Sequence, residues 1–200
     1  MFDHRENLEE NRKIRTSSRE MARKLYLSYP TCALAEDPET EYSIRNRFAL
    51  LYQVPLSSVQ IIGSAKTGFS LIKKSNFTPA LSDLDIAVID GRLFYQVWED
   101  AYETSHGFEA NRFQDPLDQN SVVIVGGGQQ RFLSYLQRGI IAPDFLPSGT
   151  LRQRLIGDAA RISTGFKKNF SKISAFFYAS ELFFQKKQID AVEKHWNDAQ

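Results

Sequence analysis

The chain has 200 residues, 42% hydrophobic and 12% aromatic, which is enough apolar surface for a folded core and excludes a disordered chain. Lys and Arg number 25 against 24 Asp and Glu, so a net charge of +1 supplies no overall field that attracts nucleic acid or an anionic membrane. The N-terminal stretch MFDHRENLEE is charged, no run reaches the length of a membrane span, and the single Cys32 excludes an internal disulfide. We therefore expect a cytoplasmic protein with no membrane contact.

The first third of the chain predicts two helices and a strand. Residues 6–27 lack Gly and Pro and place apolar side chains at helical intervals, and Pro30 stops this helix. Residues 41–53 predict a second helix that ends before Pro55. The β-branched stretch SSVQII, residues 57–62, then predicts a strand that ends at a glycine.

The clearest strand is predicted over residues 82–90, SDLDIAVID, where Leu84, Ile86 and Val88 share one face. The remaining elements follow in chain order: a helix over 91–105, coil over 106–120, a short strand or helix start over 121–125, a helix ending at Gly139, a loop over 141–149, a helix over 150–162, a strand over 172–179 and a helix over 180–196. The glycine triplet at 126–128 is expected to form a turn.

These elements predict an α+β fold with a small mixed sheet and helices at both chain ends. Residues 1–55 are expected to form a helical segment packed on the core, and residues 56–200 a single globular domain. The sequence shows no internal repeat and no linker long enough to require two independent domains.

Candidate chemistry lies between Gly63 and Asp85. The stretch IIGSAKTGFS has the glycine spacing of a phosphate-binding loop, but Phe69 replaces the lysine that such a loop needs. Asp83 and Asp85 lie two residues apart on a predicted strand, so both point to the same side, where Mg²⁺ can offset their repulsion. Glycine lets the backbone approach a phosphate, and Ser64 adds an N–H and a hydroxyl. The two segments together predict a site for a metal–triphosphate.

The pair of motifs GSAKTG and SDLDIAV resembles the signature of the DNA polymerase β-like nucleotidyltransferase superfamily, over a short part of the chain. The resemblance implies a minimal nucleotidyltransferase-like fold with residues 71–80 as an inserted loop. By resemblance, Gly63 and Ser64 hold the β- and γ-phosphates, and Asp83 and Asp85 bind Mg²⁺ or Mn²⁺. The implied reaction transfers a nucleoside monophosphate from an NTP such as ATP to a hydroxyl of an RNA end, a protein or a small molecule.

The sequence departs from this pattern at a third carboxylate, which active members usually carry on a neighbouring strand. In the predicted strand 172–179 the comparable position is Ser174 or Ala175, and neither ligates magnesium as an acid does. We expect Asp144, in a loop between two prolines, to replace it as a catalytic residue, with Asp158 as the weaker candidate. Without a third acid, the protein binds nucleotide and does not turn it over.

Two cations are candidate nucleotide-binding residues: Lys66 within the Gly-Ser loop, and Arg138 beside a glycine at a helix end. Arg138 serves equally well as a helix-terminus charge or as a phosphate clamp. Lys73 and Lys74 either screen the phosphates or the acceptor, or belong to a solvated loop.

Three classes of function remain open from the sequence. The first is a metal-dependent nucleotidyltransferase. The second is a non-catalytic nucleotide-binding subunit that regulates or pairs with a partner protein, as in toxin–antitoxin or antiviral phage-defence systems. A plain interaction scaffold explains the helices but not the carboxylate pair. A third acid near Asp83 and Asp85 separates the first class from the second.

Overall fold

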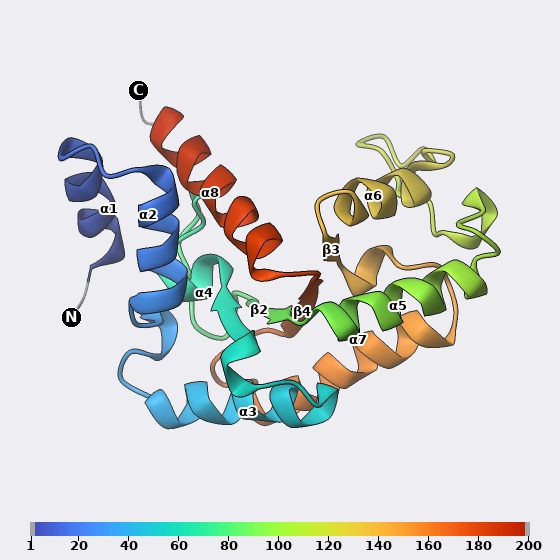
Figure 1. Cartoon of the computed structure of the whole chain (residues 1–200), viewed down its shortest axis with the longest axis horizontal. Helices are drawn as coiled ribbons and strands as arrows, with labels where there is room; N and C mark the ends of the chain where they lie inside the picture. Colours follow the sequence, from blue (N-terminus) through green and yellow to red (C-terminus); the bar gives the residue numbers. More distant parts are fainter. Residues whose placement is uncertain (1–2, 199–200) are drawn as a thin grey trace.

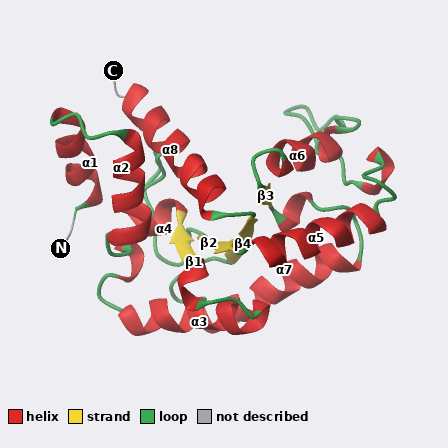
Figure 2. Ribbon diagram, in the orientation of Figure 1, coloured by secondary structure: helices red, strands yellow, loops and turns green. Residues whose placement is uncertain are grey.

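The computed structural model describes residues 3–198 and has a four-stranded mixed sheet at its centre (Figures 1 and 2). The strand order is β1-β2-β4-β3. β2 pairs with β1 in antiparallel and with β4 in parallel orientation, and β3 pairs antiparallel with β4. The strands are β1 (Val59–Ile62), β2 (Leu84–Ile89), β3 (Ile140–Ile141) and β4 (Ile173–Tyr178). The fold is α+β, as expected.

Helices cover both faces of the sheet (Figure 1). They are α1 (His4–Lys13), α2 (Ser18–Arg23), α3 (Pro38–Tyr52), the short α4 (Gly63–Thr67), α5 (Gly91–Thr104), α6 (Gly127–Leu136), α7 (Thr150–Ser163) and α8 (Glu181–Asn197). Within residues 3–198, none of the helices combines the length and the apolar character needed to cross a membrane.

The two faces of the sheet bury two hydrophobic cores, because side chains of a strand alternate between faces. One core packs the sheet against α3, α5 and α7, and it contains the predicted face of β2, which is confirmed: Leu84, Ile86, Val88, Ile44, Phe48, Phe94, Leu155 and Phe177. The other core lies under α1, α2 and α8: Leu8, Met21, Leu25, Ala87, Tyr178, Phe184 and Val192. The N-terminal helical segment therefore contributes side chains to both cores.

The helix predicted over residues 6–27 is wrong as a single element, because the chain turns between α1 and α2. Arg15 adopts a left-handed conformation with φ of 59°. Ser17 then starts a new helix, since its hydroxyl accepts a hydrogen bond of 3.1 Å from the Glu20 N–H. A π-helical turn, Lys24–Ser28, continues α2 toward Pro30.

α3 begins at Pro38, earlier than predicted. The Asp37 carboxylate accepts from the Thr40 N–H at 3.0 Å, and proline at the first helical position costs no hydrogen bond. The helix predicted over residues 41–53 therefore starts three residues earlier, at a proline.

Residues 121–125 form neither strand nor helix, and the glycine triplet predicted as a turn instead begins α6. Asp115 orders this start, because its carboxylate oxygens accept from the N–H groups of Gly126 and Gly128, each at 3.0 Å. A Cβ on Gly128 would lie 2.4 Å from the Gln114 carbonyl oxygen. The two residues of β3 were missed because so short a strand carries no alternation.

Candidate functional site

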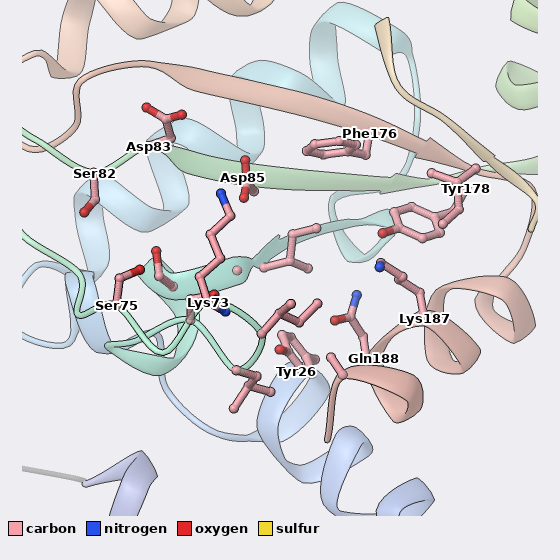
Figure 3. A pocket seen from close by; sticks show the side chains of 18 of the residues that line it. Tyr26, Lys73, Ser75, Ser82, Asp83, Asp85, Phe176, Tyr178, Lys187 and Gln188 are labelled. Atoms are coloured by element: carbon pink, nitrogen blue, oxygen red, sulfur yellow. Dashed lines mark hydrogen bonds between the residues drawn. The ribbon is translucent and has the colours of Figure 1, made fainter. Parts of the chain in front are cut away.

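A cavity of about 460 Å³ lies on the sheet face that α8 covers (Figure 3). Its walls come from the end of β1, from α4, from the loop before β2, and from β2, β4 and α8. Among the residues that line it are Gly63, Ser64, Lys73, Ser75, Asp83, Asp85, Phe176, Tyr178, Lys187 and Gln188.

The structure brings four of the predicted site residues together around this cavity: Gly63, Ser64, Asp83 and Asp85. The antiparallel register pairs Ile62 with Asp85, so the turn that follows β1 lies beside the Asp85 carboxylate. Gly63 has φ of 69°, and a Cβ there would lie 2.8 Å from Asp85 Oδ2. Glycine is therefore required both by the backbone conformation and by the approach of the carboxylate.

Asp85 is the more enclosed of the two carboxylates. Burial and the neighbouring charge of Asp83 raise the pKa of Asp85 to about 6, against the smaller opposing effects of Lys172 and Lys73. A bound cation would lower the pKa of such an enclosed acid, because a positive charge at short range favours the ionised form. Figure 3 shows the Lys73 side chain extending toward Asp85.

Asp83 lies at the more open end of the cavity, where two residues from the segment entering β4 hold it. Its carboxylate accepts a short hydrogen bond from the Ser171 hydroxyl and lies 3.5 Å from Lys172 Nζ. Both charges of this ion pair are largely exposed, so the pair orients Asp83 more than it stabilises the fold. No sequence pattern marks Ser171 and Lys172 as site residues, because only the parallel pairing of β2 with β4 brings them near the aspartates.

The donor set fits a hard divalent cation. Magnesium is usually held by one or two carboxylates together with substrate phosphates, and Asp83 and Asp85 supply the two carboxylates. In the described part of the chain, no group of three His, Cys, Asp or Glu side chains is placed to hold a metal ion. The remaining ligands of a cation here would therefore be water and phosphate oxygens.

The position next to Asp85 on β4 is Ser174, in register with it. On the same face of β4, Phe176 and Tyr178 follow and line the cavity. Of the two positions that the sequence analysis left open, Ser174 is the one beside the aspartates. The face of β4 that lies next to Asp85 thus presents a hydroxyl and two aromatic rings, and β4 places no carboxylate there.

Neither candidate for the third acid lines this cavity. Asp144 sits in a short 3-10 turn after β3, where it lines a second cavity of about 360 Å³ and a third beside Arg131. Asp158 points from α7 into the opposite side of the molecule and pairs with Arg161. The proline-bounded segment that we expected to direct Asp144 inward instead forms a 3-10 turn directly after the edge strand β3, which places Asp144 at the edge of the sheet.

Lys66 and Arg138 also lie outside the cavity. Lys66 is only 6% exposed, and its Nζ donates to the Tyr29 carbonyl oxygen at 2.7 Å. Burial lowers the pKa of Lys66 to about 8. The turn of α4 directs this side chain away from Ser64, so it fastens α4 to the segment after α2. Arg138 donates to the Ser134 carbonyl oxygen and stacks 4.7 Å above the Tyr135 ring.

Side chains of α8 complete the cavity at the end away from Asp83 (Figure 3). Gln188 is buried and hydrogen-bonds with the Tyr178 hydroxyl. Lys187 is half-buried, and this burial lowers its pKa. Sequence patterns gave no signal for these residues, since the packing of α8 on the sheet alone decides which of its polar side chains face inward.

No protein-family model, curated protein or solved structure matches the chain.

Proposed function

We propose that the cavity binds a nucleoside triphosphate together with Mg²⁺ or Mn²⁺. The observation that carries this proposal is the contact of the Gly63 turn with the Asp85 carboxylate, which puts a phosphate-type turn and a metal-type carboxylate pair in one cavity. A cavity of about 460 Å³ is within the size range of small-molecule sites.

Each part of the cavity has a role in this proposal. Asp83 and Asp85 hold the cation, which neutralises phosphate charge when bound. The backbone and hydroxyl of Ser64 donate to phosphate oxygens, and the Lys73 ammonium adds a positive charge beside them. The nucleoside then extends toward Phe176 and Tyr178, whose rings provide an apolar surface.

Among the functions considered, nucleotide binding without turnover is supported best. Activation of an acceptor hydroxyl requires a further carboxylate, as a base or as a ligand of the catalytic ion. Ser174 and Phe176 occupy the face of β4 where that group is needed. We therefore infer a nucleotide-responsive protein that regulates or pairs with a partner protein.

Nucleotidyl transfer is the second candidate, and one observation favours it. The second cavity, of about 360 Å³, shares Phe176 with the first and is lined by Ser171 and Lys172, both of which contact Asp83. It provides space for an acceptor from RNA, a protein or a small molecule near Ser171 and Lys172.

Calorimetric titration of the full chain with each NTP, with and without Mg²⁺, tests the proposal. Asp83→Asn and Asp85→Asn are each expected to weaken Mg²⁺–NTP binding by about tenfold or more, the loss of one charge-assisted contact. Asp100→Asn is the matched control, because Asp100 pairs with Arg154 beside a separate cavity. A native chain that binds no NTP with Mg²⁺ overturns the proposal.

A second assay separates the two candidates. The native chain is incubated with labelled NTPs, Mg²⁺ or Mn²⁺, and bulk RNA or cell protein, and label transfer is measured. Binding without transfer supports the regulatory function. Transfer that is lost in Asp85→Asn establishes the enzymatic one.

A further inference from the structure

The positive charge of Lys187 lies in the cavity, and the proposed triphosphate makes no use of this charge. Its side chain comes from α8 and lies beside Tyr178 and Gln188, at the opposite end of the cavity from Asp83 (Figure 3). Burial of an ammonium group is unfavourable unless an anion compensates it. Among the ion pairs formed within residues 3–198, none involves Lys187.

The charges around Lys187 are predominantly positive. Arg138 and Lys194 both act on its ammonium as like charges, and Asp190 is the opposing acid. Asp190 already pairs with the exposed Lys186 at 2.9 Å. Lys187, which lines the cavity, and the exposed Arg138 and Lys194, which lie outside it, are defined here as a cation cluster.

We propose that this cation cluster holds a second phosphate group, separate from the phosphates at the Gly63 turn. The inference rests on the proposed function, because the nucleoside then lies between the aspartates and Lys187. The ligand is a nucleotide phosphorylated on both sides of its ribose, or an NTP with the phosphodiester of a neighbouring nucleotide strand.

A phosphate suits this end of the cavity better than a neutral base edge does. The lysine ammonium is a compact point charge that binds phosphate without a fixed geometry. The added charges of Arg138 and Lys194 strengthen attraction for an anion, but not for a neutral carbonyl group. Gln188, which could otherwise read a base edge, is engaged with the Tyr178 hydroxyl.

The test compares the NTP that binds most tightly with the same nucleotide carrying an additional 3′-phosphate, by calorimetry in Mg²⁺. We expect the 3′-phosphate to tighten binding about tenfold in the native chain, the effect of one charge-assisted contact. Lys187→Gln removes this gain, so the NTP and its 3′-phosphorylated form should bind the variant with affinities within about twofold of each other. Lys168→Gln, an exposed lysine that lines neither cavity, retains the full gain.

A second arm identifies the source of the phosphate. Binding of a labelled RNA tetranucleotide is measured with the NTP saturating, for the native chain and Lys187→Gln. Dependence on Lys187 in the tetranucleotide arm alone assigns the phosphate to a strand, and dependence in the 3′-phosphate arm assigns it to the nucleotide. If the native chain binds the NTP but neither arm depends on Lys187, the cation cluster assignment fails and the proposed function stands. If no NTP binds, both fail.

Discussion

Gly63 lies directly against Asp85, with room for no side chain between them: a Cβ on the glycine would lie 2.8 Å from the Asp85 Oδ2 atom. The antiparallel pairing of β1 with β2 creates this contact, because it places the last residue of β1 opposite Asp85. The contact joins the two halves of the proposed site, so a change at the glycine affects both.

Gly63→Ala is expected to destabilise the fold by about 1–3 kcal/mol, since alanine must adopt a positive φ and displace a carboxylate. Affinity for Mg²⁺–NTP should fall in the fraction that remains folded. Denaturant unfolding and calorimetry measure the two effects. Gly157→Ala is the control: Gly157 lies within α7 with no atom near its would-be Cβ, so alanine should stabilise by about 0.5–1 kcal/mol. Equal effects of the two substitutions would show that the Asp85 contact imposes no constraint.

Asp85→Asn is expected to stabilise the metal-free protein in a pH-dependent way. The pKa of Asp85 rises from an ordinary 3.8 to about 6, so ionising it costs folding free energy above about pH 6 and costs nothing below about pH 4. The full cost corresponds to roughly 3 kcal/mol. The variant should therefore exceed the native chain in stability by about 2–3 kcal/mol at pH 8 and match it near pH 4.

Urea unfolding of the two proteins at several pH values, with a chelator present, measures this difference. Adding Mg²⁺ should stabilise the native chain more than the variant, because the cation offsets the same repulsion. If Asp85→Asn raised stability equally at pH 4 and pH 8, the gain would come from packing and not from removal of the charge.

The part of the site that the sequence predicts is the part encoded locally. Period-two alternation puts Asp83 and Asp85 on one face, and the glycine after β1 fixes the adjacent turn. The position of Asp144 depends on the two-residue strand β3, which leaves no pattern in the sequence. The inward direction of Lys187 depends on how a whole helix packs. The helix break at Arg15 was missed although Ser17 is a favourable N-cap, because apolar periodicity continues through it.

Two buried tyrosines should respond in opposite ways to loss of the hydroxyl. Tyr52 Oη is buried with no hydrogen-bond partner in the described residues, whereas the Tyr178 hydroxyl bonds with Gln188. Tyr52→Phe is therefore expected to stabilise the protein by about 1 kcal/mol, and Tyr178→Phe to destabilise it by a similar amount. Thermal and denaturant unfolding at neutral pH compare them. Destabilisation by both changes would mean that the Tyr52 hydroxyl finds a partner such as water in solution.

Lys66 and Lys73 are close in sequence, but their substitution should have different effects. Replacing Lys66 should lower the stability of the fold, and replacing Lys73 should lower the affinity for Mg²⁺–NTP. Lys66 is buried and donates to the Tyr29 carbonyl oxygen, whereas Lys73 is exposed, lines the cavity and faces Asp85. Lys66→Met removes the hydrogen bond that Lys66 donates to this carbonyl and should cost about 1–3 kcal/mol of stability, with Mg²⁺–NTP affinity unchanged. Lys73→Met should weaken Mg²⁺–NTP binding about tenfold and change stability by less than about 0.5 kcal/mol. Unfolding curves and calorimetry on both variants test the pair. A loss of affinity in Lys66→Met at full folding would return Lys66 to the nucleotide site, and unchanged affinity in Lys73→Met would remove Lys73 from it.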